Sequence, residues 1–335
     1  MFRLQSQSLQ LRRRPSRTLP ARSVYPAATE RVIVVGVGFG PPSRRALRRA
    51  DELARALGCR LRLVHAAAES SVEPTVPAFV RQQLAELPDS AERMQTTVQA
   101  WAAFLAGVMV PTSQICTEPG DPLSVLQKEA ARPDVAMVVL GRGERPGGCA
   151  RSSLAHQLLR ICPRPVLVVG ERGLSPVIMA ATDCTDDKLP VLWEASALVP
   201  ALGDKVVAVH NLDAEACRRA ASLGQPLTPQ LAGMLCTGVQ EWLDASQEAH
   251  ELLITNQDST AEGVLAAARS QQADLLVVGA RSEHEAEKRT AEILLDECPV
   301  SVLLVPLGRE PEARCSPVMA AAPQPLEPAA QEPLP

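Results

Sequence analysis

The sequence contains two copies of one unit, and this internal repeat constrains the fold more than any other feature. RVIVVGV (31 to 37) aligns with PVIMAAT (176 to 182) at a shift of 145 residues, and the same shift aligns the stretches from 51 to 65 and from 196 to 210. Further on, AMVVLGR (136 to 142) aligns with DLLVVGA (274 to 280), and ICPRPVLVV (161 to 169) with ECPVSVLLV (297 to 305). A repeat of this length predicts two domains of one fold, at 31–170 and 175–306.

Each copy alternates short apolar runs with segments of helical periodicity. Val32 to Val35 is a continuous β-branched run, which is typical of a strand buried on both faces of a parallel sheet. The apolar residues from 46 to 57 then recur at helical spacing, with Ser43 placed to cap the helix and Gly58 to end it. The first copy continues with predicted strands at 61–65, 137–140 and 166–169 and helices at 91–105, 123–131 and 154–161. This order predicts an α/β fold, with a doubly wound, Rossmann-like parallel sheet in each domain.

Both ends of the chain differ in composition from the repeat. Residues 1–30 contain six arginines and one glutamate, and 310–335 are rich in proline and alanine. We expect both tails to be disordered. The first tail also has the composition of a mitochondrial transit peptide, although a disordered tail of a bacterial protein is the favoured interpretation.

Charge and composition exclude several classes of partner. Without the first tail, 28 basic and 37 acidic side chains give a net charge of about −9, and aromatic residues make up only 2% of the chain. A body with no basic stripe and so few aromatic rings argues against nucleic acid as a partner. The longest apolar runs are strand-length, far below the roughly 20 residues of a membrane span. We therefore expect a protein without a membrane partner.

Nine cysteines occur singly, with no CxxC pair. This pattern predicts neither a zinc site nor a disulfide framework, and it suggests a reducing, cytoplasmic location. Cys162 and Cys298 occupy equivalent positions, as do His65 and His210 at the ends of the second predicted strands. We expect packed thiols and packed, hydrogen-bonded imidazoles at these four positions, and no metal site.

These features together resemble the universal stress protein family in a tandem, two-domain form. The resemblance is based on the opening strand and helix with its ARALG ending, the Leu-Val-His strand end, and the glycine loop before the Pro-Val-Leu-Val-Val strand. It implies an adenine nucleotide hydrolase-like fold, with ATP as the cofactor that many members bind. Such members place an aspartate after the first strand and a loop of the pattern Gly, two residues, Gly, nine residues, Gly, Ser or Thr around the phosphates.

Each copy departs from the family's ATP site in a different part. In the first, Gly38 replaces the aspartate, and the resemblance implies a degenerate nucleotide site at Gly141, Gly143, Ser152 and Ser153. Ser152 and Ser153 have the alternative role of capping the last helix, since caps use the same residues. The second copy keeps Asp183 but only Gly279 of the loop, so we expect its nucleotide site to be lost. Asp183 is then a turn residue.

The glycine-rich stretch VGVGFGPPS (35 to 43) is expected to be a strand-to-helix turn and not a phosphate cradle. Read as a dinucleotide fingerprint from Gly36, it has Pro41 where the third glycine belongs. The glycines instead allow the chain to reverse before the first helix.

Three functions follow from these residues. The first is a stress-response binding or signalling module whose two domains form an internal pseudo-dimer and contact an unidentified protein partner or a further copy of the chain. The second is a structural, partner-binding pseudo-dimer that binds no nucleotide. The third is a weak ATPase or nucleotide-transferring enzyme. Phosphoryl transfer requires clustered positive charge or a metal with a positioned base, and the sequence shows neither, so we assign no catalytic residue.

Overall fold

The computed structural model describes most of the repeat. The described residues are 31–67, 82, 90–143, 154–171, 175–183, 189–212, 239, 242–243, 250–281 and 285–307. The two tails and the predicted site residues Ser152 and Ser153 lie outside these ranges.

The first copy alternates strands and helices as the sequence predicts. Its elements are β1 (Val32–Gly36), α1 (Pro41–Leu57), β2 (Arg60–Ala67), α3 (Ser90–Trp101), the π-helical turn η1 (Ala102–Ala106), the 3₁₀ turn η2 (Thr112–Gln114), β3 (Ile115–Pro119), α4 (Pro122–Ala130), β4 (Val135–Gly141), α5 (Leu154–Ile161) and β5 (Val166–Val169). The edge strand β3 is the element that the sequence did not predict. Of its five residues only Ile115 is buried, so the strand carries no apolar run.

The second copy repeats this order. Its elements are β6 (Val177–Ala181), α6 (Pro190–Leu202), β7 (Lys205–Asn211), β8 (Glu251–Thr255), α10 (Thr260–Ser270), β9 (Leu275–Arg281), α11 (Glu285–Glu297) and β10 (Ser301–Leu307).

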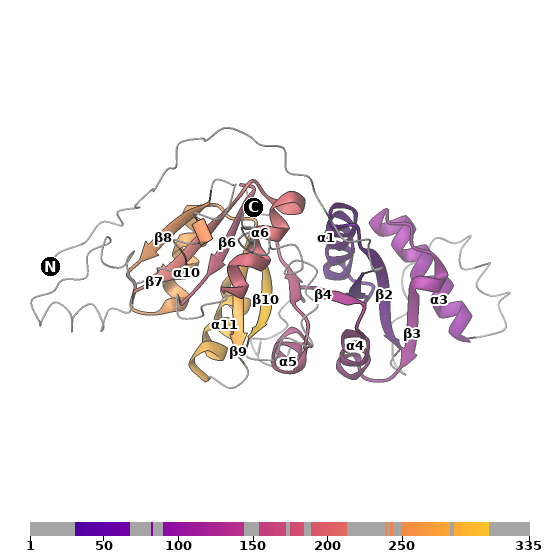
Figure 1. Cartoon of the computed structure of the whole chain (residues 1–335). Coiled ribbons are helices and arrows are strands. Elements are labelled where there is room, and N and C mark those ends of the chain that lie inside the picture. The colour runs from indigo at the N-terminus through magenta and orange to yellow at the C-terminus, as the bar shows by residue number, and fades with distance from the viewer. Residues whose placement is uncertain are drawn as a thin grey trace, which may run out of the picture.

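All ten strands form one sheet, in the order β3-β2-β1-β4-β5-β10-β9-β6-β7-β8. Pairing is parallel within each copy, and the single antiparallel pair of the named strands joins β5 to β10, with Leu167 opposite Leu303. Outward from this central pair, the equivalent strands of the two copies therefore follow in the same order. In Figure 1, α1 and α6 lie above the sheet, and α4, α5 and α11 lie below it.

The register of the strands confirms the repeat residue by residue. Gly36 pairs with Val64 in the first copy, and Ala181 pairs with Val209 in the second, a shift of 145 on both strands. The mixed α/β fold with two doubly wound halves is thus the predicted one.

Two hydrophobic cores, one on each face of the sheet, run through both copies. The core on one side includes Leu47 of α1 and Leu192 of α6, and the core on the other includes Leu158 of α5 and Leu294 of α11. Because neither core stops at the boundary between the copies, burial of apolar surface joins the two halves as well as stabilising each.

Helix α1 begins three residues before the position expected from its cap. Pro41 is its first residue and Gly40 the N-cap, so the prediction that Ser43 caps the helix is wrong. Proline is favoured at this position because its φ is already helical and its missing N–H would have no partner. The Ser43 hydroxyl instead accepts a hydrogen bond from the amide of Gly38, at 2.9 Å. Gly58 ends the helix with a φ of 66°, as predicted.

Among the described residues, no helix is both long and apolar enough to cross a membrane.

Candidate functional site

Ligands of doubly wound sheets bind beyond the carboxyl ends of the strands, where the strand order reverses. In the second copy this point lies between β6 and β9, and a pocket of about 250 Å³ opens there. Both residues that the sequence singled out in this copy, Asp183 and Gly279, line it. The full lining consists of Ala181, Thr182, Asp183, Leu189, Pro190, Val191, Val209, His210, Asn211, Thr260, Val264, Val278, Gly279, Thr290, Leu294 and Leu307.

The pocket has mostly apolar walls with a few polar groups among them. Leu189 and Val191, at the start of α6, lie across from Leu294 of α11. Asp183 is exposed where the chain leaves β6, and His210 is the residue before the last of the neighbouring strand β7. An apolar cleft with a few polar groups is the usual composition of a small-molecule site.

Two glycines allow the elements around the pocket to approach closely. A Cβ on Gly279 would lie 2.4 Å from Cδ1 of Leu307, so glycine lets the Leu307 side chain lie over the end of β9. A Cβ on Gly263 would lie 2.2 Å from Oδ1 of Asn211, so glycine also sets the distance of α10 from β7. The sequence predicted the first of these positions and missed the second, since an isolated glycine in a helix gives no sign of what it packs against.

The equivalent edge of the first copy is built differently. Gly141, at the end of β4, lies against the start of α1, and a Cβ on it would be 2.2 Å from the backbone carbonyl of Pro42. Gly143 has open space around it. The structure therefore does not bring the two glycines into one described cradle, and Gly141 has a packing role that the sequence did not show.

An aromatic cluster covers the end of β2 in this copy. Phe39 has a φ of 59°, and its ring lies 4.6 Å from the ring of His65 and 5.8 Å from that of Trp101. The indole Nε1 of Trp101 donates a hydrogen bond to the Phe39 carbonyl oxygen, at 3.1 Å. This bond and the ring contacts hold Phe39 in the left-handed conformation, which costs a non-glycine residue about 1–3 kcal/mol. His65 is consequently 4% exposed.

Arg142, which stands between the two glycines of the first copy, points to the second copy. Its guanidinium donates hydrogen bonds to the carbonyl oxygens of Cys298 and Val300, the latter at 3.0 Å. These carbonyls precede β10, so the side chain ties the end of β4 to the entry of the partner domain's closing strand. The Arg142 guanidinium thus has an interdomain role.

Cys162 and Cys298 are buried free thiols, as expected. The two histidines also match their expectation. Nδ1 of His65 lies 2.8 Å from the carbonyl oxygen of Val37, and Nδ1 of His210 lies 2.9 Å from that of Thr182.

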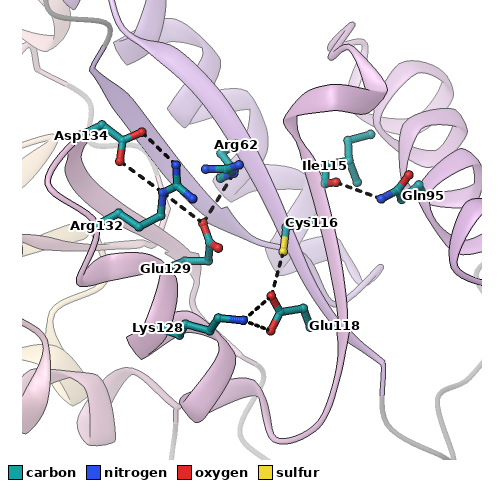
Figure 2. A network of polar contacts seen from close by, with 9 residues as sticks. All are labelled: Arg62, Gln95, Ile115, Cys116, Glu118, Lys128, Glu129, Arg132 and Asp134. Atoms are coloured by element: carbon teal, nitrogen blue, oxygen red, sulfur yellow. Dashed lines mark hydrogen bonds and ion pairs between the residues drawn. The ribbon is translucent and has the colours of Figure 1, made fainter.

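A second cluster of polar side chains lies between β3 and α4, away from the pocket (Figure 2). Ligand-type atoms of Cys116, Glu118 and Glu129 lie within 4.8 Å of one another, a spacing that a metal ion could use. Both carboxylates already have cationic partners. Nζ of Lys128 is 2.8 Å from each oxygen of Glu118, and Nε of Arg62 is 3.5 Å from Oε2 of Glu129.

The state of the thiol also favours an ion-pair network over a metal site. Burial, followed by the negative charges of Glu129 and Glu118, raises the pKa of Cys116 to about 11. Metal binding requires the thiolate. Forming the Cys116 thiolate would be costly at this raised pKa. A bound metal would also have to displace Lys128 and Arg62 from their carboxylates.

We predict that Cys116 reacts slowly with alkylating reagents. A pKa of about 11 in place of 9.0 leaves about 100-fold less thiolate at neutral pH. Residue-resolved iodoacetamide labelling followed by mass spectrometry measures this rate. Glu118→Gln removes one of the charges that raise the pKa and should speed the labelling of Cys116. An equal rate in both proteins, at the level of a free thiol, would contradict the account.

Comparisons with known proteins agree with this architecture. The sequence profile of the universal stress protein family matches residues 30–170 and again 176–306. No curated protein matches the chain significantly. Among solved structures, a universal stress protein from Archaeoglobus fulgidus aligns with a TM-score of 0.57 and 14% identity, over 84% of this chain and all (100%) of that one. A protein of unknown function from Pseudomonas aeruginosa aligns with a TM-score of 0.54 and 15% identity, over 83% of this chain and 93% of that one. At these identities the solved structures support the fold alone.

Proposed function

The chain belongs to the universal stress protein family, in a tandem form with two copies of the family domain, and from this premise we propose a stress-response binding function centred on the pocket of the second copy. We further propose that this pocket holds the adenosine part of an adenine nucleotide. The observation that carries the proposal is the pocket itself, which lies at the switch point of the sheet and is lined by both Asp183 and Gly279.

The size and chemistry of the pocket support a ligand of nucleoside size. Its volume of about 250 Å³ is near the lower end of the range for small-molecule sites, about 300–1,000 Å³. Val209 of β7 and Val264 of α10 line the pocket on the side of His210 and offer apolar contact to a planar base. The Asp183 carboxylate offers two acceptor oxygens, which suit the neighbouring hydroxyls of a ribose.

We place the site in the second copy and not around Gly141 and Gly143 in the first. There, Pro42 lies against Gly141, Phe39 covers His65, and Arg142 is engaged with the second copy. Nothing in this choice depends on Ser152 or Ser153.

We propose binding without turnover. Among the described lining residues there is one carboxylate and one imidazole but no lysine or arginine. Phosphoryl transfer needs positive charge or a metal at the transferred group, together with a positioned base. The described part of the pocket can therefore orient a nucleoside but offers little to stabilise a phosphoryl transition state.

We also propose that the two copies work as an internal pseudo-dimer. The antiparallel pairing of β5 with β10 supports this, because each closing strand is already paired within the chain. The buried pair Arg49 and Asp274 joins α1 of one copy to the residue before β9 of the other, and its disruption, considered below, tests the proposal.

Calorimetric titration of the full chain with adenosine and with ATP and magnesium tests the ligand. We expect one site per chain, and a loss of affinity of about tenfold in Asp183→Asn because a hydrogen bond to a charged acceptor contributes about 1.5 kcal/mol or more. The melting temperature should change little, since Asp183 is exposed.

Asp204→Asn is the matched control. Asp204 is an exposed carboxylate of the same copy, but it precedes β7 and so lies at the opposite edge of the sheet. Absence of heat with both ligands, or equal affinities for the two variants, would contradict the proposed site.

A further inference from the structure

Each copy contains a histidine that makes the same hydrogen bond to a backbone carbonyl. This bond fixes which ring nitrogen carries a proton. His65 lies near the end of β2, with its Nδ1 bonded to the carbonyl oxygen of Val37, and His210 lies near the end of β7, with its Nδ1 bonded to that of Thr182. A carbonyl oxygen can only accept, so Nδ1 carries the proton in both rings. In the neutral imidazole the other nitrogen, Nε2, is then a hydrogen-bond acceptor.

The surroundings of this acceptor differ between the copies. Nε2 of His65 is buried and has no hydrogen-bond partner among the residues that the structure describes, and the ring of Phe39 lies against the imidazole. His210 is only half-buried and lines the pocket. Within the described chain, Nε2 of His210 has no protein partner. The same strand-end histidine is therefore covered in the first copy and available to a ligand in the second.

The side-chain amide of Asn211, the residue after His210, already makes hydrogen bonds within the protein. Oδ1 of Asn211 accepts hydrogen bonds from Oγ1 of Thr255, at 2.9 Å, and from the amide of Gln257, at 3.0 Å. Its Nδ2 donates to the carbonyl of Gln257, at 3.3 Å. Asn211 thus holds the turn that follows β8. At this end of the pocket, His210 thus offers a ring nitrogen as an acceptor, which Asn211 does not.

The order of strands places this acceptor beside Asp183. β6 lies between β9 and β7, so Asp183 stands between Gly279 on one side and His210 on the other. A nucleoside whose ribose contacts Asp183 can lie along the pocket in two orientations, and in one of them its base lies beside His210.

We propose that Nε2 of His210 accepts a hydrogen bond from an amino group on the ligand's base, and that His210 thereby selects a 6-aminopurine. This inference rests on the proposed function and names a residue that sets its specificity. An apolar pocket alone discriminates weakly between bases of similar shape, whereas an acceptor that loses its donor discriminates by about tenfold or more.

The test compares adenosine with N6,N6-dimethyladenosine, which lacks the amino donor. The full-length wild-type protein should bind adenosine about tenfold more tightly. In His210→Asn the amide nitrogen can replace the donor at Nδ1, but no acceptor remains at the place of Nε2. This variant should bind adenosine about tenfold more weakly than the wild type and lose the preference.

His65→Asn is the matched control, because it makes the same change in the first copy, outside the pocket. It should leave both affinities unchanged. His210→Gln is the second variant, since its side-chain oxygen can restore an acceptor near the position of Nε2. It should keep the preference for adenosine even if the lost bond to Thr182 lowers the melting temperature.

The outcomes separate the two proposals. If the wild type prefers adenosine and His210→Asn keeps that preference in full, another group reads the amino group, and the role of His210 is overturned while the proposed site stands. Wild-type protein that binds both nucleosides equally overturns it as well. If adenosine and ATP both fail to bind the wild type, the proposed function itself fails.

Discussion

Replacing Asp274 by alanine is expected to lower the free energy of unfolding by about 3–5 kcal/mol. Arg49 and Asp274 are each 7% exposed and form an ion pair between α1 of the first copy and the residue before β9 of the second. Without the carboxylate, the Arg49 guanidinium stays buried near the boundary of the copies. Its remaining bond is to Glu52, a half-exposed partner at 3.2 Å, which places the expected loss at about 3 kcal/mol.

Urea denaturation followed by circular dichroism measures this loss. We expect a single transition in the wild type, because both cores run through both copies. The double variant Arg49→Met, Asp274→Leu is the control, since apolar replacement of both partners of a buried pair is often neutral. If Asp274→Ala unfolds at the wild-type midpoint, the pair does not hold the copies together, and the internal pseudo-dimer loses its main electrostatic support.

The second large effect on stability is expected for Gly141→Ala, while the same substitution at Gly143 should have almost none. Gly141→Ala should cost about 1–3 kcal/mol or more, because the new Cβ would lie 2.2 Å from the backbone of Pro42, which cannot rotate away as a side chain could. Gly143→Ala should be nearly neutral, since a Cβ there meets no atom within 4 Å. Thermal unfolding of the two variants measures the difference.

The Gly141 and Gly143 variants also test whether these glycines bind a ligand or serve the packing of α1. If Gly141 served a ligand and not the packing of α1, its substitution would change nucleotide affinity at constant stability. The account predicts the reverse: a lower melting temperature for Gly141→Ala, and unchanged affinity for adenosine in Gly143→Ala. Equal melting temperatures for the two variants would show that α1 adjusts to the extra methyl group.

The fold could be predicted from the sequence because the signals are periodic and occur twice. The apolar run at Val32 and its counterpart at Val177 become equivalent strands, and the shift between them persists in the pairing of Gly36 and Ala181. Ser43 and β3 show the limits of such signals. A serine that fits a cap can bond elsewhere when a proline starts the helix earlier, and an edge strand with one buried residue leaves no apolar pattern.

The candidate site was harder to predict because it depends on contacts between distant segments. Motif comparison gave weight to the glycines of the first copy, while the pocket lies in the second, where Asp183 and Gly279 had seemed insufficient. The difference comes from side chains that no motif includes. Phe39 covers the histidine of one copy, and His210 stays open in the other. The direction of Arg142, towards carbonyls some 156 residues away, likewise follows only from the assembled sheet.

The most direct test of a ligand site in the second copy is hydrogen–deuterium exchange of the full chain with and without adenosine, read by mass spectrometry. The account predicts slower exchange around Thr182 and Asp183, at the ends of β7 and β9, and no change in 37–43 or at Gly141 and Gly143. Protection confined to the first copy, or none in either copy at saturating adenosine, would contradict it.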